Sequence, residues 1–168
     1  MLKSTGIPTP ADLAQVYPDK QRLERGPVAI IECFQSIPCN PCATACPRGA
    51  ILPFADINDR PQLDAEKCNG CGLCVVNCPG LAIFVVDMAY SEKEALLKMP
   101  YEFLPLPQPG AVVTALNRAG QAVGTGTVIR VQSPPAFERT ALIHLAVAKD
   151  LAHEVRNIKV EDETDEAR

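Results

Sequence analysis

Apolar residues occur along the chain mainly as short runs and alternations of strand length. A run such as 81–86 is far shorter than the roughly 18 residues that a membrane span requires, but it suits a strand. Residues 141–148 alternate, with Ile143, Leu145 and Val147 expected on one face. The pattern predicts strands over 27–31, 81–86, 112–116, 123–131, 141–148 and 158–160.

Short helices are predicted where capping residues and helix-breaking residues bracket a segment. Thr9 and Pro10 form a typical helix start, with Thr as the cap and Pro at the first helical position. Pro18 and Gly26 are expected to end the first two helices. The helical segments predicted are 11–17, 19–25, 91–99 and 149–155.

Changes in composition divide the chain into five parts. Prolines at 100, 105, 107 and 109 predict an extended linker, and the acidic C-terminal run predicts a disordered tail. The parts are an N-terminal docking arm (1–30), a cysteine-bearing domain (31–88), a Pro-rich linker (89–108), a small β module (109–160) and an acidic tail (161–168).

The β module is predicted to be a compact all-β unit that resembles a barrel. Asn117 and Gly120 supply turn residues between its first two strands, which predicts a hairpin. Gly124 and Gly126 within the second strand predict a bulge or bend.

Charge and targeting signals narrow the classes of partner. The net charge is −4 and no basic stripe is present, so nucleic acid is not expected as a partner. The N-terminal residues lack the apolar core of a secretory signal, and no membrane span is predicted, so a cytoplasmic location is expected. Cytosolic thiols stay reduced, so the eight cysteines indicate metal binding rather than disulfides.

The cysteines form an internal repeat. Two copies of Cys-x2-Cys-x3-Cys-Pro begin at Cys39 and Cys71, 32 residues apart. Cys68 precedes the second copy and completes the run Cys-x2-Cys-x2-Cys-x3-Cys-Pro, which binds [4Fe–4S] clusters in bacterial ferredoxins.

On these motifs, residues 31–88 resemble a bacterial-type two-cluster ferredoxin domain. In such domains the fourth cysteine of each run binds the other cluster. The resemblance implies two [4Fe–4S] clusters and an α+β, ferredoxin-like fold with a pseudo-twofold repeat, followed here by the barrel-like module. The implied ligands are Cys33, Cys39, Cys42 and Cys78 for cluster I, and Cys46, Cys68, Cys71 and Cys74 for cluster II.

Cluster I departs from the family pattern, because the usual first cysteine would fall at Ser36. Cys33 is the one unassigned thiol, and eight cysteines match two four-thiolate sites, so Cys33 is favoured. The alternatives are a free, buried Cys33 with a [3Fe–4S] cluster I, or an oxygen ligand from Ser36. Zinc also binds Cys-x2-Cys pairs, but not typically such a triplet followed by Cys-Pro.

The two clusters are expected to differ in reduction potential. Gly70 and Gly72 allow N–H groups to approach the sulfur atoms of cluster II, whereas Pro38 and Pro41 remove donors from the cluster I loop. Arg48 adds positive charge beside cluster II. We therefore predict the higher potential for cluster II.

No catalytic residue is predicted. His144 and His153 are expected to be solvated surface residues rather than ligands or bases. The sequence contains no nucleotide-binding fingerprint and no nucleophile-elbow motif.

The stretch Glu-Cys-Phe-Gln-x-Ile-Pro-Cys-Asn-Pro-Cys from Glu32 to Cys42, with the C-terminal module, resembles the small iron–sulfur subunit of multi-subunit FAD-dependent dehydrogenases. The resemblance implies a hetero-oligomer whose FAD-containing subunits oxidise amino acids or related amino or hydroxy compounds. This chain would pass single electrons between flavin sites, or to an acceptor. The alternative is a dissociable ferredoxin that shuttles electrons among several enzymes.

Overall fold

The computed structural model describes residues 2–160, and three short helices open it. The predicted helix start is confirmed: the Thr9 hydroxyl accepts the N–H of Asp12, and the Asp12 carboxylate accepts the N–H of Thr9 at 2.8 Å. The three helices are α1 (Leu2–Thr5), α2 (Pro10–Ala14) and α3 (Lys20–Leu23).

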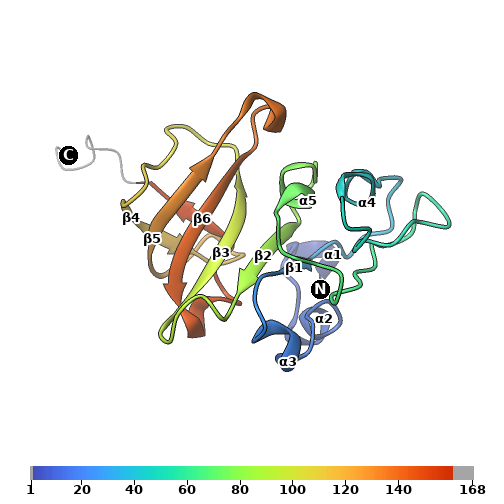
Figure 1. The fold of residues 1–168 in the computed structure, drawn as a ribbon, viewed down its shortest axis with the longest axis horizontal. Coiled ribbons are helices and arrows are strands. Elements are labelled where there is room, and N and C mark those ends of the chain that lie inside the picture. The colour runs from blue at the N-terminus through green and yellow to red at the C-terminus, as the bar shows by residue number, and fades with distance from the viewer. Residues whose placement is uncertain (1, 161–168) are drawn as a thin grey trace.

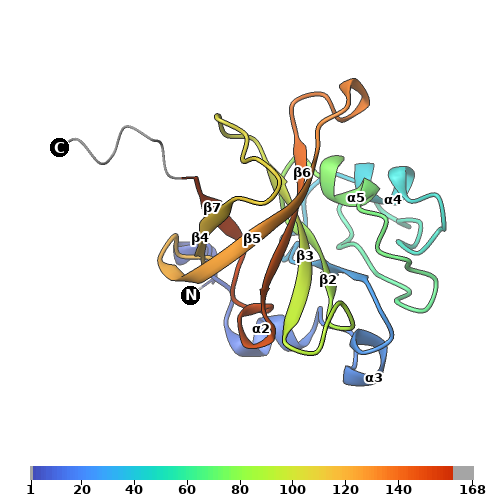
Figure 2. The same cartoon turned by 60° about the vertical axis from the view of Figure 1, so that its left-hand side comes forward.

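Seven strands form one open antiparallel sheet in the order β1-β2-β3-β6-β5-β4-β7. Figures 1 and 2 show that the sheet curls strongly towards its β4–β7 side. The strands are β1 (Val28–Ile31), β2 (Ile83–Asp87), β3 (Glu94–Tyr101), β4 (Val112–Leu116), β5 (Ala122–Gln132), β6 (Ala141–Ala148) and β7 (Asn157–Lys159).

The cysteine-bearing segment lies beside one face of this sheet (Figure 1). It contains the helices α4 (Pro41–Ala45) and α5 (Leu73–Val76). Strand β6 is buried on both faces: Ile143 and Leu145 belong to the main core, whereas Leu142 packs with Val75 beneath the cysteine loops. The segment therefore shares its core with the rest of the sheet.

The local structure predicted for the linker (89–108) is wrong. Residues 91–99 do not form a helix, because strand β3 occupies most of that range and pairs with both β2 and β6. Its burial alternates, with Ala95, Leu97 and Met99 in the core. Pro100 lies beyond Lys98, the last β3 residue paired with β2, and it pairs with Leu142 of β6 near the end of the strand.

The barrel-like module is also corrected. Strands β4 and β5, with the 117–120 turn between them, are confirmed, but they continue the sheet that begins at β1 rather than closing a separate barrel. The β4–β5 register shifts between Ala115 and Leu116, and the β5–β6 register shifts between Val128 and Arg130. Along β5, the first irregularity comes before Gly124 and the second after Gly126. A Cβ on Gly126 would lie 2.8 Å from Leu145, so β6 packs closely there.

The two histidines are not solvated as expected. His144 is buried, and its Nε2 lies 2.8 Å from Oε1 of Gln132, because both faces of β6 are covered. His153 is partly buried and packs edge-on against Tyr17, with ring centroids 4.7 Å apart. The 149–155 segment forms only the short helix η2 (Lys149–Leu151), and another, η1 (Pro135–Phe137), precedes β6.

Most of the regular structure is strand, so the α+β class is met only in part. Residue 1 of the predicted arm and the predicted acidic tail (161–168) lie outside the described residues. Within residues 2–160, none of the helices has the length and hydropathy needed to cross a membrane.

Candidate iron–sulfur site

The two copies of the cysteine motif adopt corresponding structures. The N–H of Ala50 donates to Sγ of Cys46 at 3.3 Å, and the N–H of Ala82 donates to Sγ of Cys78 at 3.4 Å. Helices α4 and α5 begin 32 residues apart, as the repeat does, and pack against each other. The Cys-Pro corner is therefore held by the same local contact in each copy.

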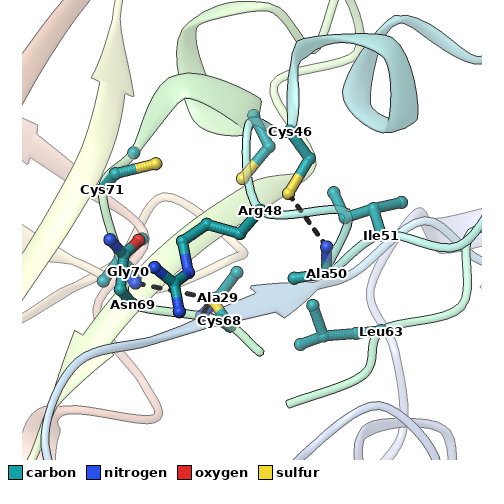
Figure 3. Close-up of a pocket in the computed structure, with 13 residues that line it drawn as sticks. Ala29, Cys46, Arg48, Ala50, Ile51, Leu63, Cys68, Asn69, Gly70 and Cys71 are labelled. Atoms are coloured by element: carbon teal, nitrogen blue, oxygen red, sulfur yellow. Dashed lines mark hydrogen bonds between the residues drawn. The ribbon is translucent and has the colours of Figure 1, made fainter. Parts of the chain in front are cut away.

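The four cysteines predicted for cluster II surround one cavity between strand β1 and the two cysteine loops. Figure 3 shows Cys46, Cys68 and Cys71 around this space, with the Arg48 side chain extending along it. The lining consists of Ala29, Cys46, Arg48, Ala50, Ile51, Leu63, Cys68, Asn69, Gly70, Cys71, Gly72, Cys74 and Val85.

These four thiols also interact electrostatically. Burial raises the pKa of the Cys74 thiol to about 12, and the thiolates that add to this rise are those of Cys46, Cys68 and Cys71. Cys71 is exposed, whereas Cys74 is buried. The group thus extends from the interior to the surface.

The four cysteines predicted for cluster I form a second electrostatic group. Burial raises the pKa of the Cys42 thiol to about 11. The thiolates that add to this rise are those of Cys33, Cys39 and Cys78. Burial likewise raises the pKa of Cys33, where the charges of Cys78 and Cys39 act in the same direction. The thiolates that act most strongly on Cys42 are thus those of the other three cysteines predicted for cluster I.

Backbone N–H groups stabilise individual sulfur atoms. Sγ of Cys68 accepts the N–H of Ala29 and the N–H of Gly70, both at 3.4 Å. At Cys46, burial is outweighed by the N–H groups of residues 48–51, which lower the pKa of its thiol. Such donors favour thiolates, the form in which cysteine binds iron.

The donor set fits iron–sulfur clusters better than single metal ions. All eight cysteines are free thiols. Within residues 2–160, no three Cys, His, Asp or Glu side chains converge closely enough to hold one metal ion. A [4Fe–4S] cluster instead requires one thiolate at each of four separate iron atoms, and four cysteines around a cavity fit that requirement.

Two cations beside the cluster II cysteines were not predicted from the sequence. Arg22 of α3 donates to the carbonyl of Cys68 at 2.7 Å, and Lys98 of β3 donates to the carbonyl of Gly70 at 2.6 Å. Their partners are 46 and 28 residues away, so no local pattern could identify either contact. Arg48, which was predicted beside cluster II, lies there and donates to the carbonyl of Lys67 at 3.0 Å.

A buried ionic network adjoins Cys33. Both Arg118 and Arg156 donate to the carboxylate of Glu32, at distances of 2.6 to 2.9 Å. Arg156 also bonds the Tyr17 hydroxyl and lies over the Phe84 ring, 4.8 Å from its centroid. Although burial opposes it, the two guanidinium groups lower the pKa of Glu32. The network connects the start of the cysteine region to the N-terminal arm and the last strands.

Comparison with known families identifies this region. Residues 35–82 match the family model of the 4Fe-4S dicluster domain. The chain carries a ferredoxin-type iron–sulfur domain. The matched residues contain every cysteine except Cys33, so the cysteine-bearing part of the chain is an iron–sulfur domain.

The similarity to known proteins covers only part of this chain. The chain is 40% identical over 52 residues to the ferredoxin-type protein NapF of Escherichia coli (strain K12), covering 30% of this chain and 32% of NapF. It is 37% identical over 59 residues to NapF of Haemophilus influenzae, covering 33% of each chain. It is 43% identical over 61 residues to UacF of E. coli (strain K12), described by name as an oxidoreductase, covering 36% of this chain and 8% of UacF.

The matched region therefore spans about a third of the length of the NapF relatives. No solved structure matches the chain. The seven strands and the N-terminal helices lie outside the residues that the family model matches.

Proposed function

We propose that this chain is the iron–sulfur subunit of a multi-subunit flavin-dependent dehydrogenase that acts on an amino acid or a related amino or hydroxy compound. FAD-containing subunits would bind and oxidise the substrate. This chain would carry single electrons between flavin sites, or from a flavin to an acceptor, in a cytoplasmic complex.

The observation that carries the electron-transfer role is the cavity lined by Cys46, Cys68, Cys71 and Cys74, within the region that matches the 4Fe-4S dicluster domain. Each bound [4Fe–4S] cluster would supply a one-electron store. The proposed ligands of cluster I are Cys33, Cys39, Cys42 and Cys78, and those of cluster II are Cys46, Cys68, Cys71 and Cys74.

Exposed apolar side chains beside the cluster I cysteines support a protein partner. Ile37 and Ile57 are 43% and 45% exposed, and the carbonyl of Ile57 accepts the N–H of Cys39 at 3.2 Å. Exposed apolar surface next to a redox site favours docking of another protein. A flavin subunit seated there would lie close to cluster I.

The second candidate is a dissociable ferredoxin. The matches to NapF favour it, since NapF is a ferredoxin-type protein and the aligned segment is about the same share of either chain. A shuttle of this kind would meet several enzymes in turn rather than belong to one complex.

Anaerobic purification of the native protein from its source distinguishes these functions. A dehydrogenase subunit will co-elute with flavin-containing chains, and about eight iron atoms will be present for each copy of this chain. A flavin-free protein of 18.1 kDa with the same iron content would instead support the shuttle. Iron below about four atoms per chain after anaerobic purification would contradict both.

A further inference from the structure

Two segments outside the cysteine repeat contribute cations to the loop that carries Cys68 and Cys71. The first is the N-terminal arm. Arg22 of α3 is only 7% exposed, although it carries a full positive charge. Its guanidinium donates to four carbonyls that bring the arm, the start of β1 and this loop together: those of Ala65, Gly26, Pro27 and Cys68, at 2.7 to 3.1 Å.

The second contributing segment is strand β3, which lies against the cysteine region through α5. Lys98 is partly buried, and its Nζ donates to the carbonyl of Gly70 at 2.6 Å. The ion pairs of the described residues do not include Lys98. Its charge interacts with the thiols of Cys71 and Cys68 and with the carboxylate of Asp87.

With Arg48, three cations bond to one short stretch of backbone. Arg48 donates to the carbonyl of Lys67, Arg22 to that of Cys68, and Lys98 to that of Gly70. Each cation comes from a different part of the chain. Two of them are partly or wholly buried, so solvent screens their charges less than it would at the surface.

The cluster I cysteines lack such a set. Among the hydrogen bonds of the described side chains, no Lys or Arg donates to a carbonyl of residues 33–42. The cation whose charge acts on the Cys33 thiol is the exposed Arg60. The nearby carboxylate of Glu32 is already held between Arg118 and Arg156.

We infer that Arg22, Arg48 and Lys98 raise the reduction potential of the site formed by Cys46, Cys68, Cys71 and Cys74 above that of the other site. This inference rests on the two-cluster function proposed above. Reduction adds negative charge, which fixed positive charges nearby stabilise. An electron shared between the two sites therefore resides mainly beside Cys71, the exposed thiol of its group.

Lys98 offers the sharpest test because its charge and its hydrogen bond can be separated. Lys98→Gln removes the charge and keeps an N–H donor for the Gly70 carbonyl, whereas Lys98→Arg keeps the charge. Lys93→Gln is the matched control, since Lys93 is exposed at the other end of the same hairpin. The measurement is an anaerobic redox titration of the full chain followed by electron paramagnetic resonance.

The variants Cys33→Ala and Cys71→Ser identify which signal belongs to which site. In the wild-type protein, the signal altered by Cys71→Ser will be reduced at the higher potential. Lys98→Gln will shift that potential downwards and leave the other in place, while Lys98→Arg and Lys93→Gln will leave both near their wild-type values.

Several results would overturn the inference. One is a wild-type titration in which the signal altered by Cys33→Ala is reduced first. Another is an equal shift of both signals in Lys98→Gln, or the same shift in Lys98→Gln and Lys98→Arg, which would indicate a structural effect. Iron content separates these failures from failure of the proposed function, because a chain with about eight iron atoms still supports two clusters.

Discussion

Arg118 and Glu32, 86 residues apart in sequence, form a two-pronged ion pair: Nε of Arg118 lies 2.8 Å from Oε2 of Glu32, and Nη2 lies 2.6 Å from Oε1. Their side chains are only 12% and 8% exposed. Since Glu32 directly precedes Cys33, this pair fixes the entry to the cluster I loop against the turn between β4 and β5. The C-terminal strands are thus part of the scaffold of the iron–sulfur site.

Removing the carboxylate should destabilise the fold. Glu32→Gln leaves Arg118 and Arg156 facing each other without a counter-charge, and breaking a buried pair in this way costs about 3 kcal/mol of unfolding free energy. Anaerobic urea titration of the loaded protein, followed by far-ultraviolet circular dichroism, measures the change.

The matched control is Glu66→Gln, which makes the same chemical change in the exposed pair between Glu66 and Arg25. Exposed pairs contribute little, so the control should remain close to wild type. A loss in Glu32→Gln no larger than in Glu66→Gln would show that the buried network does not stabilise the fold.

The cysteine repeat could be predicted because its chemistry is local. The spacing within each copy determines which thiols share a loop. Neighbouring residues also determine the helix starts, the N–H donor at Gly70 and most of the strands, so the local sequence predicts them. Strand β3 was missed although Ala95, Leu97 and Met99 alternate, because its Glu, Ala, Leu and Lys residues favour a helix in isolation. Pairing with two neighbouring strands overrode that preference.

The charged residues around the site could not be predicted in the same way. Arg22, Arg118 and Arg156 all have partners more than 40 residues away, and isolated arginines in a sequence most often lie on the surface. His144 was misplaced for a related reason. Its strand was expected to have one solvated face, but the cysteine region covers that face.

Gly70 should not tolerate a side chain. Its φ of +64° is unfavourable for other residues, and a Cβ there would lie 2.5 Å from Cβ of Pro27 and 3.0 Å from the Pro27 backbone. Gly70→Ala should cost roughly 1–3 kcal/mol and displace the N–H that bonds Cys68, so iron should be lost mainly from the cluster II site.

Iron and acid-labile sulfide analysis, with electron paramagnetic resonance to separate the two sites, tests this expectation. Gly80→Ala is the control, because a Cβ on Gly80 meets no atom within 4 Å and its φ is not positive. Equal iron in the two variants would contradict the role given to the Gly70 backbone.

His144 should make stability depend on pH. Burial, together with the charges of Lys98 and Arg130, lowers its pKa to about 4, compared with 6.5 for a free histidine. As the pH falls, His144 therefore binds a proton in the unfolded chain at a higher pH than in the folded protein. The contribution of His144 is complete above pH 6.5 and decreases between pH 6.5 and about 4, by about 1.4 kcal/mol per pH unit at most.

His144→Gln removes this titration while keeping a polar side chain opposite Gln132. Anaerobic unfolding measured at several pH values should show the stability difference between the wild-type protein and the variant narrowing as the pH falls from 6.5 to 4. Acid loss of the clusters affects both proteins and cancels in the comparison. A difference independent of pH would mean that His144 is not held neutral in the folded protein.

The ligand set of cluster I is tested by removing Cys33. The Cys33 thiol interacts electrostatically with Cys78 and Cys39, as a fourth ligand of that site would. Cys33→Ala should lower iron by about one atom per chain if a [3Fe–4S] cluster forms, or by about four if the site empties. Only one of the two paramagnetic signals should change, because Cys33 does not line the cavity formed by the cluster II cysteines.

Ser36→Ala is the matched control, since the usual family position of the first cysteine falls at Ser36, which is exposed. It should leave iron content and both signals unchanged. The opposite result, in which Ser36→Ala disturbs one signal and Cys33→Ala disturbs none, would identify the serine oxygen as the fourth ligand. Iron unchanged in both variants would mean that cluster I has only three protein ligands from this loop and Cys78, so its cluster would be [3Fe–4S] in the wild-type chain.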